Sequence, residues 1–313
     1  MQREMESLRS HIGELLNKVE NENVIVMDAD LAKSTTTADF RDKNPNRFVE
    51  CGISETSAMG IASGLAMEGK IPIYVNFSIF LIGSAYTQLR QACYANLNIK
   101  LIGTHPGLDD GPDGASHHAN EDIALSRVLP NLKILIPSSI KELKECIDLA
   151  VKFNGPVFIR CSRDLVPVIS NRKPYEVKFG KFETIYDDGD DITIICEGTA
   201  ATVGLDSFEK LKDKGYMSKL INISSIKPVD KEGIIKLALN SKLMITIENH
   251  TILGGLGGLV AEVLSEMPKH APLIRIGVND IFTESGNINE IKEKYGISAS
   301  RVLERVDKIL NYI

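Results

Sequence analysis

The chain has 313 residues, which at roughly 100–200 residues per domain suggests two domains. Its 36 basic and 42 acidic residues give a net charge of −6, spread along the sequence rather than gathered in blocks. Because a nucleic-acid binder usually carries a basic face, nucleic acid is not an expected partner. A hydrophobic content of 43% and a charged content of 25% are those of a globular protein, which excludes disorder and coiled coil as descriptions of the whole.

No stretch of the sequence approaches the ~20 apolar residues that cross a bilayer, so a membrane span is not expected. The amino terminus is charged over residues 1–7 and continues into a helical pattern, unlike a signal peptide. Five widely spaced cysteines without a Cys-x-x-Cys pair indicate free thiols in a reducing compartment: Cys51, Cys93, Cys146, Cys161 and Cys196. We therefore expect a cytoplasmic protein.

Helical and strand patterns alternate along the first half of the chain. The first helical face is formed by Leu8, Ile12, Leu15, Leu16 and Val19. Short apolar runs then predict buried strands at residues 24–27, 48–50, 71–75, 99–102, 133–136 and 157–159. Helices are predicted between them at residues 56–69, 86–95 and 140–153. Apolar strands separated by helices indicate a doubly wound α/β domain, with a parallel sheet covered on both faces.

The second half resumes the alternation after a break. Residues 163–175 hold two prolines and no clear period, which predicts an interdomain connection. An acidic turn at 187–191 between apolar runs at 182–185 and 192–195 predicts a β-hairpin. Further strands are predicted at 219–222, 243–247 and 273–276, and helices at 200–214 and 301–310. These patterns predict two α/β domains, at residues 1–172 and 173–313, the second one smaller.

Three polar loops follow predicted strands of the first domain, at residues 28–39, 51–55 and 103–122. In doubly wound folds, ligands bind at the carboxyl ends of the strands. The third loop holds three of the chain's six histidines, several carboxylates and four glycines. A loop of this length inside a compact domain is more often functional than idle.

The residues of the third loop fit more than one role. One is a metal site, because imidazole and carboxylate are common ligands, formed by His105, Asp109, Asp113, His117 and Glu121. No recognised zinc spacing occurs among them, so this interpretation ranks low. The alternative is an acid–base pocket for a polar substrate, in which neutral histidines transfer protons near pH 7. A solvated loop that only caps the next helix accounts for one or two of these residues.

Several blocks of the sequence, taken in chain order, resemble the carboxyl-terminal half of transketolases. In the first domain they are residues 48–60, 77–80, 86–90 and 113–117, followed by 121–122, 130–131, 136–138 and 162–163. The second domain continues the resemblance at residues 226–230, 248–250 and 254–257. The blocks cover nearly the whole chain, so together they are more specific than any single motif.

The resemblance implies a subunit of a split transketolase, which uses thiamine diphosphate to transfer a two-carbon ketol unit from a ketose to an aldose. In that family a long amino-terminal domain binds the diphosphate and Mg²⁺ (or Ca²⁺) through a Gly-Asp-Gly motif followed by paired asparagines. This sequence lacks that motif. The resemblance therefore implies a pyrimidine-binding domain and a smaller carboxyl-terminal domain, with the diphosphate-binding half on an amino-terminal partner subunit. The expected assembly is α2β2, and the expected substrates are sugar phosphates or sugar sulfonates.

The resemblance also assigns the cofactor contacts. Glu55 matches the carboxyl group that hydrogen-bonds N1′ of the aminopyrimidine ring; without the resemblance, it would be a favourable charge at the start of a helix. Phe77 and Phe80 match the aromatic positions beside that ring. Asp30 matches a residue near the pyrimidine pocket, and Ile53 belongs to the same cofactor-binding set.

For the substrate, the resemblance assigns contacts with the sugar hydroxyls and the terminal anion to His105 and His117, and contact with a donor hydroxyl to Asp113. With Glu55, the two histidines form the expected catalytic set. The terminal anion is assigned to a set of three residues, Arg163, Ser34 and Arg9. Arginine suits an anion site because its planar fork makes charge-assisted, often bidentate hydrogen bonds to phosphate.

The run Gly255-Leu256-Gly257 in the second domain opens a helix, as a dinucleotide-binding loop does. Val260 stands where a third glycine is expected and no acidic partner follows, so we interpret the run as backbone packing. No chemical role is assigned to the second domain.

Three alternatives share some of these features. Deoxyxylulose phosphate synthases resemble the same blocks, but a histidine at position 105 favours transketolase. The β-subunits of 2-oxoacid dehydrogenases have a similar domain order but lack the Asp-Gly-x-x-His run at 113–117. A non-catalytic scaffold subunit is the alternative outside the enzymes, and the joint presence of Glu55, Phe80, His105 and His117 argues against it.

Overall fold

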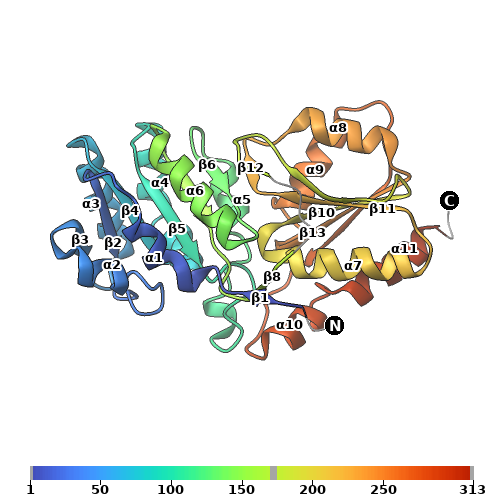
Figure 1. The fold of residues 1–313 in the computed structure, drawn as a ribbon, viewed down its shortest axis with the longest axis horizontal. Coiled ribbons are helices and arrows are strands. Elements are labelled where there is room, and N and C mark those ends of the chain that lie inside the picture. The colour runs from blue at the N-terminus through green and yellow to red at the C-terminus, as the bar shows by residue number, and fades with distance from the viewer. Residues whose placement is uncertain (1–2, 170–174, 311–313) are drawn as a thin grey trace.

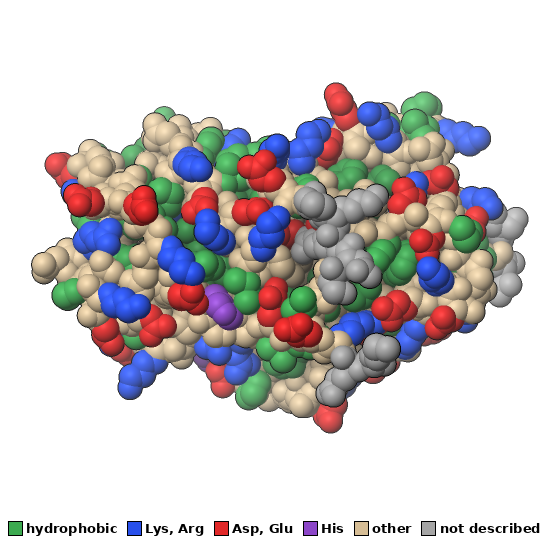
Figure 2. Space-filling view, in the orientation of Figure 1, with side chains coloured by type: hydrophobic (Ala, Val, Ile, Leu, Met, Phe, Trp, Pro, Cys, Tyr) green, Lys and Arg blue, Asp and Glu red, His purple; other side chains and the backbone are tan. Residues whose placement is uncertain are grey.

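A computed structural model describes residues 3–169 and 175–310, so the expected boundary between residues 172 and 173 lies outside the described residues (Figure 1). The described residues form two α/β domains side by side, each built around its own sheet (Figure 1). No helix in the described ranges is long and apolar enough to cross a membrane. All five cysteines are free, as expected. On the face drawn in Figure 2, basic and acidic side chains are interspersed.

The first sheet has seven strands in the order β12-β6-β7-β5-β4-β2-β3. Six of them run parallel and correspond to the six predicted strands: β2 (Val24–Asp28), β3 (Phe48–Glu50), β4 (Ile71–Phe77), β5 (Lys100–Thr104), β6 (Lys133–Leu135) and β7 (Val157–Arg160). Strands β4 and β5 are buried at every residue. This confirms the prediction of a parallel sheet covered on both faces.

Helices cover the two faces of this sheet. Those of the first domain are α1 (Ile12–Asn17), α2 (Ala38–Lys43), α3 (Glu55–Met67), α4 (Tyr86–Tyr94), α5 (Asp122–Arg127) and α6 (Ile140–Lys152), with 3₁₀ turns η1 (Arg9–His11), η2 (Pro45–Arg47) and η4 (Gly114–Ser116) and a π-helix η3 (Ile79–Ser84). The start of α6 is set by Ser139, whose hydroxyl accepts the backbone N–H of Glu142 at 3.2 Å. One core joins α1 and α6 to the sheet, and another joins α3 and α4 to the opposite face.

The second sheet has five strands in the order β14-β13-β10-β11-β9. Its strands are β9 (Glu183–Asp187), β10 (Ile192–Glu197), β11 (Ser218–Ile223), β13 (Leu243–Thr251) and β14 (Leu273–Val278). It is flanked by η5 (Gly198–Ala200), α7 (Ala201–Asp213), α8 (Lys231–Asn240), α9 (Leu256–Ser265), α10 (Ile288–Lys294) and α11 (Ala299–Leu310). The core that contains α3 and α4 continues into this domain through α9, so the two domains share buried apolar surface.

The predicted β-hairpin at residues 182–195 is wrong. Strand β9 pairs antiparallel with β11, whereas β10 lies between β11 and β13 and pairs with both in parallel. Every residue of β10 is buried, so this strand belongs at the centre of the sheet, and β9 has the alternating exposure of an edge strand. The acidic turn ends one strand and begins the next, and its carboxylates bind Lys212, Lys219 and Lys242.

The sequence did not reveal that one strand of the second half joins the first sheet. Strand β12 (Ser225–Lys227), from the second half, pairs antiparallel with β6 and completes the first sheet. Strand β1 (Met5–Glu6) pairs with β8 (Val166–Pro167). The long loop after β5 lies beside α10 in Figure 1, and the backbone N–H of Gly286 donates to the carbonyl oxygen of Gly111 at 2.8 Å. That loop is therefore a contact surface between the domains.

Candidate active site

The candidate site lies at the carboxyl edge of the first sheet. Strands β5, β4, β2 and β3 are consecutive neighbours and parallel, so the segments that follow them emerge at the same edge. These segments carry most of the predicted site residues: Asp30, Ser34, Ile53, Glu55, Phe80, His105, Asp113 and His117. Arg9 and Arg163 approach from η1 and from the segment after β7.

Buried Asp28 shapes the loop after β2. Its carboxylate accepts the hydroxyls of Thr35 at 2.7 Å and Thr37 at 2.8 Å, and burial raises its pKa against the opposing effect of these hydrogen bonds. The loop is thereby folded so that the backbone carbonyl of Ser34 accepts a hydrogen bond from the Arg9 guanidinium. Two members of the predicted anion group are thus in direct contact.

Glu50 holds the loops after β2 and β3 together. One of its carboxylate oxygens accepts the backbone N–H of Asp30 at 2.8 Å and that of Gly52 at 3.0 Å. Asp30 is exposed and has a φ of 62°, in the left-handed region that a non-glycine residue rarely occupies. Such conformations cost about 1–3 kcal/mol and cluster at functional sites.

Glu55 is the first residue of α3 and is half-buried. Within the described part of the chain, its carboxylate makes no hydrogen bond or ion pair. Burial raises the pKa of the Tyr74 hydroxyl, and the nearby Glu55 carboxylate raises it further. Ile53, two residues before Glu55, is 81% exposed. A carboxyl group without a partner therefore lies two residues from a large apolar side chain, and none of the described residues covers that side chain.

Four aromatic rings form a cluster next to this segment. The rings of Phe77 and Phe80 are 6.1 Å apart and nearly parallel, at 14°. The His105 ring lies 3.7 Å from that of Phe77, and the His117 ring meets Phe80 edge-on at 5.3 Å. Phe77 is buried whereas Phe80, on the π-helix η3, is half-buried, so Phe80 presents more surface to a ligand. Single-turn π-helical segments are frequent at functional sites.

His105 is kept neutral by its surroundings. It is 3% exposed, and Nδ1 lies 2.8 Å from the hydroxyl of Thr104. Burial, and then the charges of Arg163 and Arg9, lower the pKa of His105 to about 3. Its φ of 54° is another left-handed conformation of a non-glycine residue. At neutral pH this imidazole exchanges hydrogen bonds without carrying a charge.

Arg9 and Arg163 line one cavity of about 450 Å³. Nε of Arg9 is buried without a hydrogen-bond partner among the described residues, and the charge of Arg163 adds to the burial that lowers the pKa of Arg9. The Arg163 guanidinium donates to the carbonyl oxygen of Asp109 at 2.8 Å and lies 3.5 Å from the Asp110 carboxylate. Residues 286–289 of the second domain form the opposite wall. Two guanidinium groups with spare donors make this cavity suitable for an anion.

The long loop after β5 divides its polar residues between two tasks. His105, His117 and Asp113 belong to the site edge, and Asp113 is exposed. Burial raises the pKa of Asp110, and the nearby Asp113 carboxylate raises it further. His118 instead contacts the hydroxyl of Thr283 at 2.6 Å and the carbonyl of Asp110 at 3.1 Å, and it serves the domain contact. The glycines at 107, 111 and 114 also allow residues of the second domain to approach closely.

Sequence reasoning missed a set of buried charged and polar residues between the domains, which we call the interdomain seam: Asp109, Asp122, Arg160, Asn249 and Lys292. The Arg160 guanidinium donates to Asp122 at 2.8 Å and to the carbonyl of Asn249 at 2.8 Å. The Asp109 carboxylate receives hydrogen bonds from Asn249 at 2.7 Å and Lys292 at 3.2 Å. One indication of this seam was present in the sequence: the block at residues 248–250, which contains Asn249, matched the family, but no role was given to it.

The glycine run of the second domain packs as interpreted from the sequence. Buried Glu248 accepts the backbone N–H of Leu256 at 2.7 Å and of Gly257 at 2.9 Å. A Cβ on Gly255 would lie 2.0 Å from the Glu248 carboxylate. The small residues therefore admit a carboxyl group from the chain itself.

The described residues contain no group of three or more His, Cys, Asp or Glu side chains arranged to hold a metal ion. Of the loop residues considered for a metal, Asp109 is bound within the interdomain seam, whereas His105 lies in the aromatic cluster.

The pyrimidine-binding domain of transketolases matches residues 6–168, and the transketolase C-terminal domain matches residues 180–302. The chain belongs to the transketolase family. That family depends on thiamine diphosphate, and the chain is a subunit of a transketolase-type transferase.

Three relatives are named as parts of split enzymes. A putative transketolase C-terminal section from Methanocaldococcus jannaschii is 37% identical over 96% of this chain and 95% of its own length. One subunit of an apulose-4-phosphate transketolase from Phocaeicola vulgatus is 35% identical over 89% of this chain and 88% of its own. A 6-deoxy-6-sulfo-D-fructose transketolase subunit from a Clostridium species is 30% identical over 92% and 89%.

Among solved structures, a split-gene transketolase described as an inactive β4 tetramer superposes with a TM-score of 0.87 at 36% identity, covering 97% of this chain and 98% of that one. Its description fits a chain that depends on a second subunit for activity.

Proposed function

We propose that this chain, together with an amino-terminal partner subunit, transfers a two-carbon ketol unit from a ketose bearing a terminal anion to an aldose. The observation that carries the proposal is the unpartnered Glu55 carboxyl beside exposed Ile53, on the same sheet edge as the aromatic and histidine cluster. A site that leaves a carboxyl group and an apolar surface uncovered needs another component to complete it.

The side chains at this edge fit the aminopyrimidine half of thiamine diphosphate. A flat heterocycle needs an apolar or aromatic wall and one carboxyl group, which Phe80, Ile53 and Glu55 supply. The described residues offer no cluster of metal ligands for a diphosphate-bound Mg²⁺ or Ca²⁺. We therefore assign the diphosphate and the metal to the partner subunit.

Thiamine diphosphate, when bound, supplies the carbon nucleophile that carries the two-carbon unit. The role of Glu55 is to hold a proton between its carboxylate and ring N1′. Phe80, with the Phe77 ring 6.1 Å from it, would supply the aromatic wall for the ring, and Asp30 and Ile53 would add contacts beside Glu55. General acid–base help of this type is typically worth about 10²–10⁴-fold in rate.

His105 and His117 accept and donate hydrogen bonds at the hydroxyl groups of the sugar. The lowered pKa of His105 keeps its imidazole neutral, so at neutral pH it binds the sugar hydroxyls as a hydrogen-bond donor and acceptor without carrying a charge. Exposed Asp113 binds a hydroxyl of the donor. Arg163 and Arg9, which line the 450 Å³ cavity, hold the terminal anion together with Ser34, whose carbonyl oxygen contacts Arg9. Phosphate and sulfonate both present oxygen acceptors there, and both kinds of substrate occur in the names of the relatives.

The partner is proposed to cover an apolar surface on α3, α4 and the loop before α3, which includes the exposed side chains Ile53, Ile61, Met67 and Tyr94. On α3, Gly60 and Gly64 leave the helix backbone open to a close neighbour. Two copies of this chain and two of the partner give the α2β2 assembly.

The experiment is reconstitution. Alone, the chain should show negligible ketol transfer from a ketose phosphate to an aldose. With an amino-terminal transketolase subunit, thiamine diphosphate and Mg²⁺, it should turn over, and size-exclusion chromatography with light scattering should give the mass of two copies of each subunit. Full turnover by the chain alone would contradict the two-subunit proposal.

A further inference from the structure

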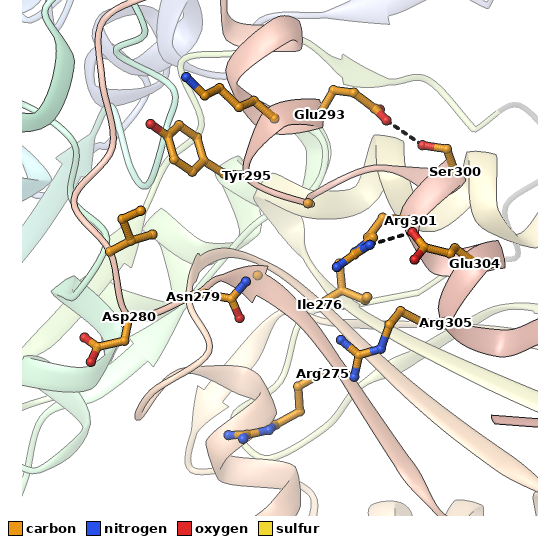
Figure 3. Close-up of a pocket in the computed structure, with 14 residues that line it drawn as sticks. Arg275, Ile276, Asn279, Asp280, Glu293, Tyr295, Ser300, Arg301, Glu304 and Arg305 are labelled. Atoms are coloured by element: carbon orange, nitrogen blue, oxygen red, sulfur yellow. Dashed lines mark hydrogen bonds and ion pairs between the residues drawn. The ribbon is translucent and has the colours of Figure 1, made fainter. Parts of the chain in front are cut away.

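A second cavity, of about 850 Å³, lies within the carboxyl-terminal domain (Figure 3). It opens at the carboxyl end of the edge strand β14 and is bounded by the loop after that strand and by α10 and α11. None of the residues assigned above to the cofactor, the sugar or its anion lines it. It is a separate site.

Three arginines face this cavity. Arg301 and Arg305 are four residues apart on α11 and thus share one helix face, and Arg275 comes from β14. In Figure 3 the guanidinium groups of Arg301, Arg305 and Arg275 follow one below the other along the wall. Gly296, with a φ of 85°, lets the α10–α11 connection pass close to the Arg301 side chain.

The carboxylates around the cavity neutralise only some of these cations. Glu304 pairs with Arg301 at 2.5 Å, whereas Glu293 accepts the hydroxyl of Ser300 at 2.6 Å. Arg275 donates to a backbone carbonyl, that of Ile252, at 3.0 Å. Arg305 makes no hydrogen bond or ion pair within the described ranges.

Two guanidinium groups without a carboxylate partner among the described residues therefore face one cavity of a chain whose net charge is −6. In Figure 3 the carboxylate of Asp280 points away from them. Guanidinium groups that are not paired with a carboxylate are free to make bidentate, charge-assisted bonds to phosphate. The volume exceeds that of a phosphate ion, and Ile276, Ile281 and the ring of Tyr295 add an apolar wall.

We propose that this cavity binds a phosphorylated small organic molecule, with its phosphate on Arg275 and Arg305 and its organic part against Tyr295. The proposal does not depend on the proposed function, because no residue is shared between the two sites. Binding should weaken with added salt, since the contacts are partly exposed and ionic.

The test uses the full-length chain with pyrophosphate as the probe, and isothermal titration calorimetry at low salt measures the binding. The wild-type chain should bind, and Arg305→Gln should weaken binding by about tenfold or more, since it removes a charge-assisted bond. Glu304→Gln should tighten binding, because it frees Arg301. A gain of affinity is a readout that damage to the fold does not produce.

Two matched variants keep the test specific. Lys308→Gln removes one positive charge from α11 outside the cavity and should not change the affinity. Arg163→Gln removes one from the proposed substrate cavity, which is itself an expected anion site, so it should leave intact the binding that Arg305→Gln weakens. Loss of binding in Arg163→Gln but not in Arg305→Gln would move the anion to the substrate cavity and overturn the proposal. Equal losses in Lys308→Gln and Arg305→Gln, or no binding by the wild-type chain at millimolar pyrophosphate, would overturn it as well.

Discussion

The site edge and the interdomain seam hold similar numbers of charged groups but use them differently. In the seam, Arg160 donates to three partners and Asp109 accepts from several, and both are completely buried. At the site edge, Glu55 and Nε of Arg9 have no partner among the described residues. The loop that contains His105 contributes to both regions.

The charged groups of the seam stabilise the fold, whereas those of the site edge are left free to bind a ligand. A buried ion that is satisfied within the chain costs several kcal/mol to disrupt, whereas an unpartnered half-buried group contributes little to stability. Substitutions in the two regions should therefore have opposite profiles: loss of turnover with intact stability at the site edge, and loss of stability in the seam.

The largest expected effect is on turnover at the site edge. Glu55→Gln should lower kcat of the reconstituted enzyme by about 10²–10⁴-fold, because the amide does not exchange a proton with ring N1′. The free energy of unfolding should change by less than about 1 kcal/mol, the contribution of a charge at a helix start. Steady-state kinetics and urea denaturation measure the two quantities.

Glu68→Gln is the matched control, since Glu68 is exposed just beyond the end of the same helix. It should leave kcat unchanged. A rate for Glu55→Gln within threefold of wild type would remove Glu55 from its proposed role.

The corresponding change in the seam should act on stability. Arg160→Met leaves the carboxylate of Asp122 buried without its cation, and breaking a buried pair in this way costs about 3–5 kcal/mol. Urea denaturation should show the loss, while Arg90→Met, an exposed arginine on α4, should be nearly neutral. A loss below about 1 kcal/mol in Arg160→Met would mean that the seam is not a stabilising contact.

The same contrast accounts for what the sequence revealed. Runs such as 71–75 and 157–159 are apolar throughout, so each predicted a buried parallel strand regardless of its neighbours. The pairing of β9 with β11 was missed because an apolar pattern does not say which edge a strand occupies. The proposed role of Glu55 came through the resemblance alone, whereas His105 was already a candidate from its polar loop and received its sugar contact from the resemblance.

The seam was not predictable in the same way. Asp109 and Lys292 are 183 positions apart in the sequence, and no periodicity links them. Because Asp109 shares a loop with His105, the sequence alone suggests that it belongs to the site. Only the packing of the second domain against that loop distinguishes the two, and packing between distant segments leaves little trace in one sequence.

A smaller effect is expected from pH in the seam. Burial lowers the pKa of His250 to about 4; Nδ1 lies 2.6 Å from the carbonyl of Thr251, and Nε2 accepts the N–H of Ala124 at 3.3 Å. Between this value and the unfolded pKa of about 6.5, only the unfolded chain binds the proton. Stability from this group is therefore complete above pH 6.5 and is lost as the pH falls toward 4, by at most ~3 kcal/mol.

Asp122 raises the pKa of His250, whereas Arg160 lowers it. Asp109, whose own pKa is lowered, also makes the stability of the seam sensitive to acid. His250→Gln isolates the histidine, because its amide oxygen replaces Nε2 as an acceptor but does not titrate. The free energy of unfolding of this variant should fall less steeply between pH 6.5 and 4 than that of the wild-type chain. Equal slopes would exclude His250 as a source of acid sensitivity.

The smallest expected effect concerns Arg163, a residue of the site edge that also contacts Asp109 of the seam. Its backbone N–H donates to the Asp109 carboxylate at 3.0 Å, and this bond survives substitution of the side chain. Arg163→Gln should therefore keep nearly wild-type stability while raising KM for an anionic ketose by about tenfold, the value of one charge-assisted bond. KM for a neutral ketose should not change, nor should either KM in Lys33→Gln, which removes an exposed charge near Ser34. Equal changes for anionic and neutral substrates would assign the guanidinium to the seam, because a positioning defect does not distinguish the charge of the substrate.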